Sequence, residues 1–312
     1  MRNSKIDVKD ISLNYYKYLF GLENVTGLGF GYKYIKNIGT KEPCIHVLVE
    51  KKVESKYLTA NNIIPKYYMG IKTDVINVGK IKLKKGEAIP EKIRPLEGGC
   101  GISLKDAQGD GTLGCIVKKV KEEKVEYFIL SNNHVIAGFN RAPIGTPIVQ
   151  PSEYLGGKFE EDIIANLSNF IPVRIVTPNK EPVNQVDCAI AKINNTSINP
   201  SNIIKLQKIK GVDEISIDDN IKKVGFTSGL TEGTVNTIDA TIKVNFNGSP
   251  CIFIEQIVGE IENKSGDSGS IVVNENNSVV GLFFGGTNDD KFAFINKIQQ
   301  VLNKLKVELC FD

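Results

Sequence analysis

The 312-residue sequence predicts a mainly β fold that is preceded by a small α+β segment. Three patterns support this prediction. From about residue 96 onward, short runs rich in β-branched residues alternate with turn residues, which favours a β-sandwich or a pair of β-barrels. Before residue 96, a helical pattern is followed by strand patterns. One amphipathic helix is predicted near the end of the chain.

The first 95 residues are expected to form an accessory α+β domain. Apolar residues spaced three or four apart predict a helix over 5–20, and strand patterns follow at 25–35 and 44–53. A short helix over 54–64 and a strand over 73–79 complete it. A hinge rich in proline and glycine then separates 1–95 from a second domain, 96–312.

The second domain reads as many short strands with one helix. The predicted strands are 112–119, 124–131, 147–150, 162–171, 186–193, 221–226, 233–246, 251–261, 270–273 and 278–284. In 296–309, apolar residues at i, i+3, i+4 and i+7 predict a helix that docks one face on the strands; they are Ile298, Val301, Leu302 and Leu305.

Composition excludes several classes of partner. The 39 basic and 36 acidic residues leave a net charge of +3, and only four of the basic residues are arginines, so no nucleic acid is expected. No apolar run approaches the length of about 18 residues that spans a membrane, and no apolar segment follows the first basic residues. We therefore expect a soluble cytoplasmic chain. Its six cysteines form no Cys-x-x-Cys pair and are expected to be reduced, and no metal or cofactor is predicted.

Any chemistry that needs imidazole has two histidines available. His46 lies inside a strand pattern and is expected to be a half-exposed strand residue without a catalytic part. His134 follows an apolar strand, in the loop Ser-Asn-Asn-His-Val, where its side chain can face a cleft. His134 is thus the candidate general base.

A serine nucleophile needs such a base, and the base needs a carboxylate that fixes its tautomer. Asp187, in Val-Asp-Cys-Ala, stands at the mouth of an apolar strand; Asp162 is the second choice for this acid. Ser268 lies in the glycine-flanked turn Lys-Ser-Gly-Asp-Ser-Gly-Ser. Little side-chain bulk there lets the N–H groups of Gly266 and Ser268 converge on an oxyanion.

The order His134, Asp187, Ser268, with Gly-Asp-Ser-Gly-Ser around the serine, resembles the trypsin-like peptidases of the chymotrypsin fold. The resemblance covers about residues 96–312. It implies two six-stranded antiparallel β-barrels with a C-terminal helix, and cleavage of protein or peptide substrates through an acyl-enzyme. The sequence lacks the Ile-Val-Gly-Gly start of animal trypsins, so whether a newly cut N-terminus activates the chain stays open.

Further motifs resemble the bacterial and plant branch of this family that includes the plant narrow-leaf protease and carries an extra N-terminal domain; they are Asn-Val-Thr-Gly-Leu-Gly at 24–29, Leu-Ser-Asn-Asn-His at 130–134, Pro-Ile-Gly at 143–145 and Val-Gly-Phe-Thr-Ser-Gly at 224–229. By the same resemblance, Glu262 lies at the base of the primary substrate pocket, where an acid favours Lys or Arg. Lys291 lies in the segment lining the opposite wall and could neutralise it.

Two functions remain open at this point. The first is an intracellular serine endopeptidase, either unrestrained or held in check by residues 1–95 until a regulatory partner or a cut releases it. The second is a catalytically silent binding or scaffold protein on a peptidase fold. The complete set of His134, Asp187 and Ser268 favours the first.

Overall fold

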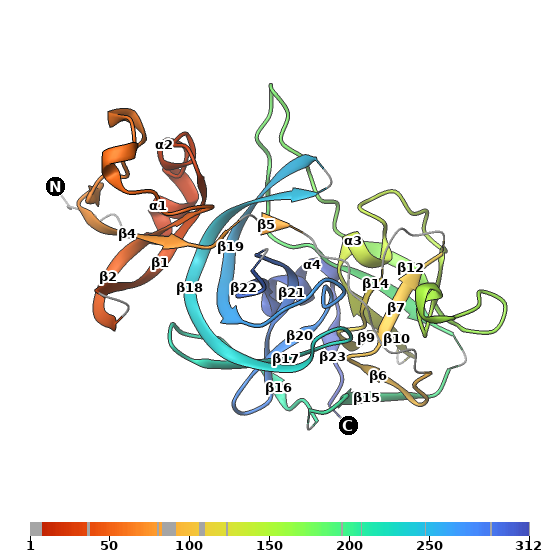
Figure 1. Cartoon of the computed structure of the whole chain (residues 1–312). Helices are drawn as coiled ribbons and strands as arrows, with labels where there is room; N and C mark the ends of the chain where they lie inside the picture. The colour runs from red at the N-terminus through yellow and green to blue at the C-terminus, as the bar shows by residue number, and fades with distance from the viewer. Residues whose placement is uncertain are drawn as a thin grey trace.

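Figure 1 shows a computed structural model of the chain, which describes residues 8–35, 38–79, 81–82, 92–105, 110–122, 124–194, 196–206, 208–246, 248–287 and 289–311. The fold is mainly β, as the sequence predicts. Two large sheets carry most of the strands, and a helix near the C-terminus packs between them. Within the described residues, no helix has the length and apolar character needed to cross a membrane.

The first barrel-like sheet follows the strand order β23-β9-β10-β14-β12-β11-β7-β8. Its strands are β7 Gly101–Leu104, β8 Gly111–Thr112, β9 Cys115–Lys121, β10 Lys124–Ser131, β11 Pro147–Val149, β12 Ile163–Phe170, β14 Ala189–Ile193 and β23 Glu308–Leu309. Its buried apolar side chains contribute to two cores: one includes Ile129, Ile148 and Ala189, and the other, which includes Phe128 and Leu130, is shared with the second sheet. Beside it, β6 Leu96–Gly98 pairs in parallel with β15 Ile198–Ile203.

The second sheet follows the order β13-β19-β22-β21-β20-β17-β18-β1-β2-β4-β3, with β18 also paired to β19. Its barrel strands are β13 Val183–Asn184, β16 Gly211–Val212, β17 Asn220–Gly225, β18 Gly229–Phe246, β19 Ser249–Ile261, β20 Ile271–Asn274, β21 Ser278–Thr287 and β22 Phe292–Lys297. β18 and β19 form a long antiparallel hairpin that reaches toward the N-terminal strands (Figure 1).

The N-terminal strands extend this second sheet, because β1 pairs with β18. They are β1 Val25–Ile35, β2 Ile38–Val49, β3 Tyr67–Tyr68 and β4 Ile71–Asn77, and β5 Ile81–Lys82 follows them. Their core also takes in Ile252 of β19. Residues 83–91 lie outside the described part of the chain, and with them Pro90, at the start of the predicted hinge. The division into 1–95 and 96–312 stays a prediction.

The helices are shorter than the periodicity predicts. The helix expected over 5–20 is two short helices, α1 Val8–Asn14 and α2 Lys17–Phe20, because its apolar residues fall at mixed spacings and pack as separate turns on β1; residues 5–7 lie outside the described part. The helix expected over 54–64 is two 3₁₀ turns, η1 Ser55–Tyr57 and η2 Ala60–Asn62. A third 3₁₀ turn is η3 Glu153–Leu155.

The predicted C-terminal helix is α4 Ile298–Leu305. Its four apolar residues are all buried, as the spacing predicts, and they join a core shared by both sheets. The helix starts later than predicted because Phe292–Lys297 is strand β22, and it ends at Lys306, which has a left-handed φ of 55°. The chain then returns to the first barrel as β23, which pairs with β9.

Candidate active site

His134 lies on the short helix α3 Asn133–Ile136, directly after strand β10. Asn132, in extended conformation, makes the turn between them. The Asn132 side chain donates from Nδ2 to the main-chain oxygen of Asp187 at 2.7 Å, which ties the loop of the histidine to the strand of the acid. The side chain of His134 is 12% exposed, so it remains within reach of a substrate.

Asp187 contacts His134 through both carboxylate oxygens. Oδ2 lies 2.5 Å from Nδ1 of the ring, and Oδ1 accepts the His134 main-chain N–H at 3.2 Å. The Asp187 side chain is fully buried. A carboxylate at Nδ1 assigns the proton to that nitrogen and leaves Nε2 as the proton acceptor. The pair therefore has the arrangement of an oriented general base.

The main chain of Asp187 is held by residues that the sequence patterns did not single out. Its N–H donates to Oδ1 of Asn296 at 2.6 Å. The Asn296 amide donates in turn to Oε1 of Gln256 at 3.0 Å. Both Asn296 and Gln256 are fully buried, and buried polar groups require partners. A polar Asn in the apolar run Phe292–Lys297 is the sequence signal that could have revealed this support.

Asp162, the alternative acid, is engaged elsewhere. Its Oδ1 lies 2.5 Å from Nζ of Lys92, and its Oδ2 accepts the Lys158 N–H at 2.9 Å. The hydrogen bond from Lys92 lowers the pKa of the Asp162 carboxyl. The structure thus brings Asp187, and not Asp162, to His134.

Ser268 lies in the loop between β19 and β20 and is 5% exposed. Its hydroxyl donates to the main-chain oxygen of Phe284 at 3.4 Å. Its carbonyl accepts the Thr112 N–H at 2.7 Å. A Cβ on Gly111 would contact both this carbonyl and the side chain of Val135, the neighbour of His134. The loop of Ser268 and the loop of His134 therefore meet at Gly111.

The loop before Ser268 presents two amide groups. Gly266 has φ +99°, and a Cβ there would lie 2.3 Å from Oγ1 of Thr227, so a side chain does not fit. The N–H groups of Gly266 and Ser268 donate to no acceptor among the described residues, whereas the Asp267 N–H closes the turn onto Lys264. Two such unused donors in one turn are what an oxyanion site needs.

A buried ion pair clamps this loop. Nζ of Lys223 on β17 lies 2.7 Å from Oδ2 of Asp267, and both side chains have zero exposure. The carboxylate also accepts hydrogen bonds from the hydroxyl and the N–H of Ser228 and from the Lys264 N–H. An internal lysine thus holds Asp267, the residue next to Ser268. Alternation in Ile221-Lys-Lys-Val already places Lys223 on the core side of β17 with Ile221.

We predict that Lys223→Met lowers kcat/KM by about 10²-fold, the scale of losing an oxyanion donor, because Asp267 then loses the cation that holds the loop. Burial lowers the pKa of Lys223 below its ordinary 10.5. Lys223 therefore loses its proton as the pH rises through that lowered pKa, and Asp267 then has no cation to hold the loop. Wild-type activity should fall on the alkaline side below pH 10.5.

The measurement is a pH–rate profile, with thermal unfolding measured alongside. Lys222→Met is the matched control on the same strand, since Lys222 is partly exposed and pairs with Glu232. It should keep the wild-type profile. A Lys223→Met variant with wild-type kcat/KM and an unchanged alkaline limb would contradict the assigned role.

Glu262 and Lys291 share an open depression of about 480 Å³, lined by Glu232, Glu260, Ile261, Glu262, Asp289, Asp290 and Lys291. They form ion pairs with other residues: Glu262 with Lys264 at 3.3 Å, and Lys291 with Glu260 at 3.0 Å. Ser268, His134 and Asp187 are not among the lining residues. Their role in substrate selection stays a prediction.

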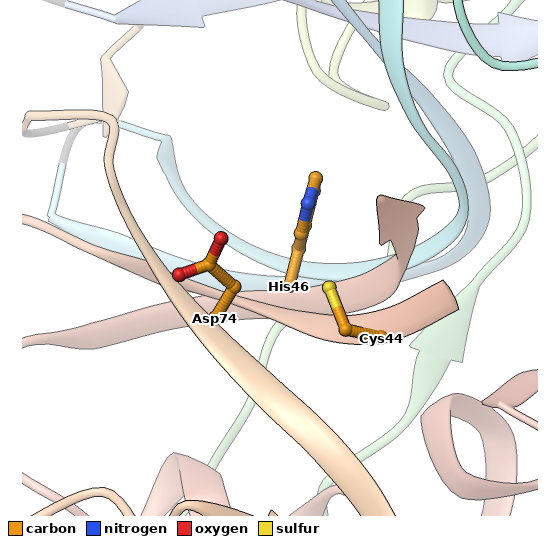
Figure 2. Close-up of side chains that lie close together, drawn as sticks. All are labelled: Cys44, His46 and Asp74. Carbon is orange, nitrogen blue, oxygen red and sulfur yellow. The ribbon is translucent and has the colours of Figure 1, made fainter. Parts of the chain in front are cut away.

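Cys44, His46 and Asp74 form the one group in the described residues whose composition and spacing suit a metal, with ligand atoms within 4.8 Å of one another. Figure 2 shows Asp74 beside His46, from the neighbouring strand. Both ring nitrogens of His46 already have partners at 2.8 Å, Oγ1 of Thr237 and the carbonyl of Tyr32. Burial raises the pKa of Cys44 to about 12, which disfavours the thiolate a metal requires. These residues therefore fit a structural core better than a metal centre.

The prediction that His46 is half-exposed is wrong, because the side chain is fully buried. Its ring covers Gly31 of the neighbouring strand, where a Cβ would lie 2.0 Å from Cε1. Its bond to Thr237 of β18 faces the second barrel, so strand β2 has no solvent face at this position. His46 thus ties the N-terminal strands to the hairpin of β18 and β19.

A family model described as peptidase S7, flavivirus NS3 serine protease, matches residues 254–297, the segment that includes Ser268 and Asn296. Among solved structures, Thermobifida fusca protease A has 14% sequence identity and a TM-score of 0.50, over 69% of this chain and 98% of that one. Nocardiopsis protease has 15% identity and a TM-score of 0.49, and Cellulomonas bogoriensis chymotrypsin 12% and 0.47, each over 69% of this chain and 98% of its own. No curated protein matches the sequence significantly.

The similarity to Thermobifida fusca protease A shows that this chain has the chymotrypsin fold, as the motifs suggested. Within that fold, the segment around Ser268 matches a serine-protease family model.

Proposed function

We propose that this protein is a serine endopeptidase that cleaves protein substrates through an acyl-enzyme. Oγ of Ser268 attacks the peptide carbonyl carbon while Nε2 of His134 takes the hydroxyl proton. The carbonyl oxygen becomes an oxyanion, which the N–H groups of Gly266 and Ser268 stabilise. The C–N bond then breaks and His134 gives its proton to the leaving amine. Water, deprotonated by His134, releases the acyl group and restores Ser268.

The observation that carries this proposal is the buried carboxylate of Asp187 at 2.5 Å from Nδ1 of His134. A buried carboxylate costs free energy unless it is paired, and this one pairs with a histidine that is still partly exposed. During the reaction the same contact stabilises the imidazolium.

The direct test is to incubate protein extracts with the full chain or with Ser268→Ala and to identify new peptide termini by mass spectrometry. The proposal expects termini produced by the wild type alone. Identical sets of termini from the two proteins would overturn it.

The second candidate is a catalytically silent binding protein. It is favoured by one observation, the hydrogen bond that the Ser268 hydroxyl makes to Phe284 in place of His134. Such bonds between nucleophile and base are often loose before a substrate binds, so this geometry does not exclude catalysis. Absence of wild-type termini would favour this candidate.

We further propose a preference for Lys or Arg before the cleaved bond, supported by the five acids around Lys291 in the depression that holds Glu262. Because the side chain of Glu262 is 60% exposed, its contribution should be small. We expect Glu262→Gln to lower kcat/KM for substrates with a basic residue at that position about two- to fivefold. Rates for leucine substrates should not change.

A peptide library with one varied position measures this preference. Glu308→Gln, on the distant strand β23, is the matched control and should leave the preference unchanged. Equal selectivity of Glu262→Gln and wild type would show that Glu262 does not select the substrate.

We also propose that the protein works in the reducing cytoplasm and that residues 1–95 restrain it. In support of the first, no disulfide joins the six cysteines, all of which are described and buried. In support of the second, the N-terminal strands are joined directly to the second barrel, because β1 pairs with β18. Removing residues 1–95 would uncover this strand edge, so tests of restraint need the full chain.

A further inference from the structure

Strand β21 has two edges, and they have different neighbours. One edge pairs with β22 from Gly281 to Gly286, where Gly286 lies across from Ala293. The opposite edge pairs first with β20, where Leu282 lies across from Ile271. It then meets the nucleophile loop, because the Gly269 N–H donates to the carbonyl of Phe283 at 3.0 Å. The Ser268 hydroxyl bonds to the next carbonyl, that of Phe284.

The same edge of β21 is next occupied by β5. Gly286 pairs with Lys82 and Thr287 with Ile81, in antiparallel orientation. Gly286 is two residues beyond Phe284, which corresponds to about 7 Å along a strand. This register directs β5 from Thr287 toward Gly286, and hence toward Ser268. β5 thus occupies the same edge of β21 that the Ser268 loop contacts, two residues further along the strand.

The other side of β5 meets the end of β18. Lys82 pairs in parallel with Asn245, and the ring of the following residue, Phe246, lies 5.7 Å from the ring of His134 in an edge-on contact. β5 therefore pairs on one side with β21 and on the other with the end of β18, whose Phe246 contacts His134. In Figure 1, β5 lies on the far side of β18 and β19 from the N-terminal strands, above β21 in the view.

An open strand edge offers main-chain N–H and C=O groups to which an extended peptide can add as another strand. A peptide substrate of the proposed peptidase would add to this edge of β21 as an extended strand. We propose that β5, which pairs with Gly286 and Thr287 on the same edge, is a built-in competitor that the substrate must displace. This inference rests on the proposed peptidase function. It gives residues 1–95 a means of restraint, since they carry the competing strand.

The competition is strong because it is intramolecular. A segment tethered by a short linker acts at an effective concentration in the millimolar range. A peptide that binds the edge weakly would therefore lose to β5. A partner that draws the N-terminal strands away would release the edge and raise activity without any cut in the chain.

The test is Ile81→Pro with Lys82→Pro in the full chain, because proline has no N–H for strand pairing. We expect kcat/KM for an eight-residue peptide to rise about tenfold or more, mainly through a lower KM. Labelling of Ser268 by a small fluorophosphonate should change less than twofold, since that reagent does not need the edge. Ile81→Ala with Lys82→Ala keeps both amides and should stay within twofold of wild type in both assays.

Several results would overturn the inference. One is an unchanged kcat/KM for the peptide in a proline variant that still takes up the fluorophosphonate. Another is an alanine variant that gains as much as the proline variant, because main-chain pairing would then not be the restraint. If no form takes up the reagent, the peptidase proposal fails, and calorimetric binding of the peptide tests the edge alone. Tighter binding to the proline variant supports competition, and equal binding contradicts it.

Hydrogen exchange on Ser268→Ala tests the same inference if the proline variant does not fold. Adding the peptide should speed exchange at the amides of Ile81 and Lys82, since the peptide takes their place. Unchanged or slower exchange at both amides, under conditions where the peptide is bound, would contradict displacement.

Discussion

Replacing Ser268 by alanine is expected to lower kcat/KM for peptide cleavage by on the order of 10⁴-fold or more. The substitution removes the oxygen that forms the acyl bond, while the Gly266 and Ser268 N–H groups, which belong to the main chain, remain. The residual rate should therefore be that of oxyanion binding alone. Because Ser268 is small and its hydroxyl makes one 3.4 Å hydrogen bond, the variant should keep its fold.

The measurement is steady-state cleavage of a fluorogenic peptide, with circular dichroism to confirm folding. Ser216→Ala, in an exposed loop, is the matched control and should retain wild-type kcat/KM. A Ser268→Ala variant within tenfold of wild type would mean that another group performs the attack.

Replacing Asp187 by asparagine should lower kcat by about 10⁴-fold, the effect known for this change in chymotrypsin-fold triads. The amide keeps the shape of the carboxylate but can present a donor to Nδ1 of His134. That contact would place the ring proton on Nε2, where it blocks base catalysis. Asn132 donates to the Asp187 main-chain oxygen and Asn296 accepts from the Asp187 N–H, so both bonds involve the main chain and the loop should stay in place.

Asp162→Asn is the informative companion to this variant, since Asp162 is bonded to Lys92 and the Lys158 N–H. It should leave kcat nearly unchanged. If Asp162→Asn lost activity while Asp187→Asn stayed active, Asp162 and not Asp187 would be the carboxylate that orients His134.

Strands and loops that are defined by neighbouring residues in the sequence could be predicted. Strands β1 and β10 occur at the predicted residues 25–35 and 124–131, because alternation and turn residues define them. The chemistry-bearing residues also follow from local motifs, since a histidine after a strand and a serine between glycines each need a specific loop. In the structure, Nδ1 of His134 lies 2.5 Å from Oδ2 of Asp187, and the catalytic roles of these residues stay a proposal.

Long-range partners could not be predicted in this way. Pairing of β1 with β18 joins residues some two hundred positions apart, and the sequence of neither strand indicates which strand is its partner. The same holds for Lys223 with Asp267 and for Asn296 with Asp187, where a buried polar residue signals that a partner exists but not which one. His46 looked half-exposed because its strand alternates, yet it is covered by β18.

The central claim is that Ser268 is an activated nucleophile, and one measurement tests it most directly. The full chain is treated with a fluorophosphonate, digested, and the modified residue identified by mass spectrometry. The account predicts a single adduct on Oγ of Ser268, absent after Ser268→Ala and strongly slowed after Asp187→Asn. An adduct on another residue, or labelling that survives Ser268→Ala, would contradict it.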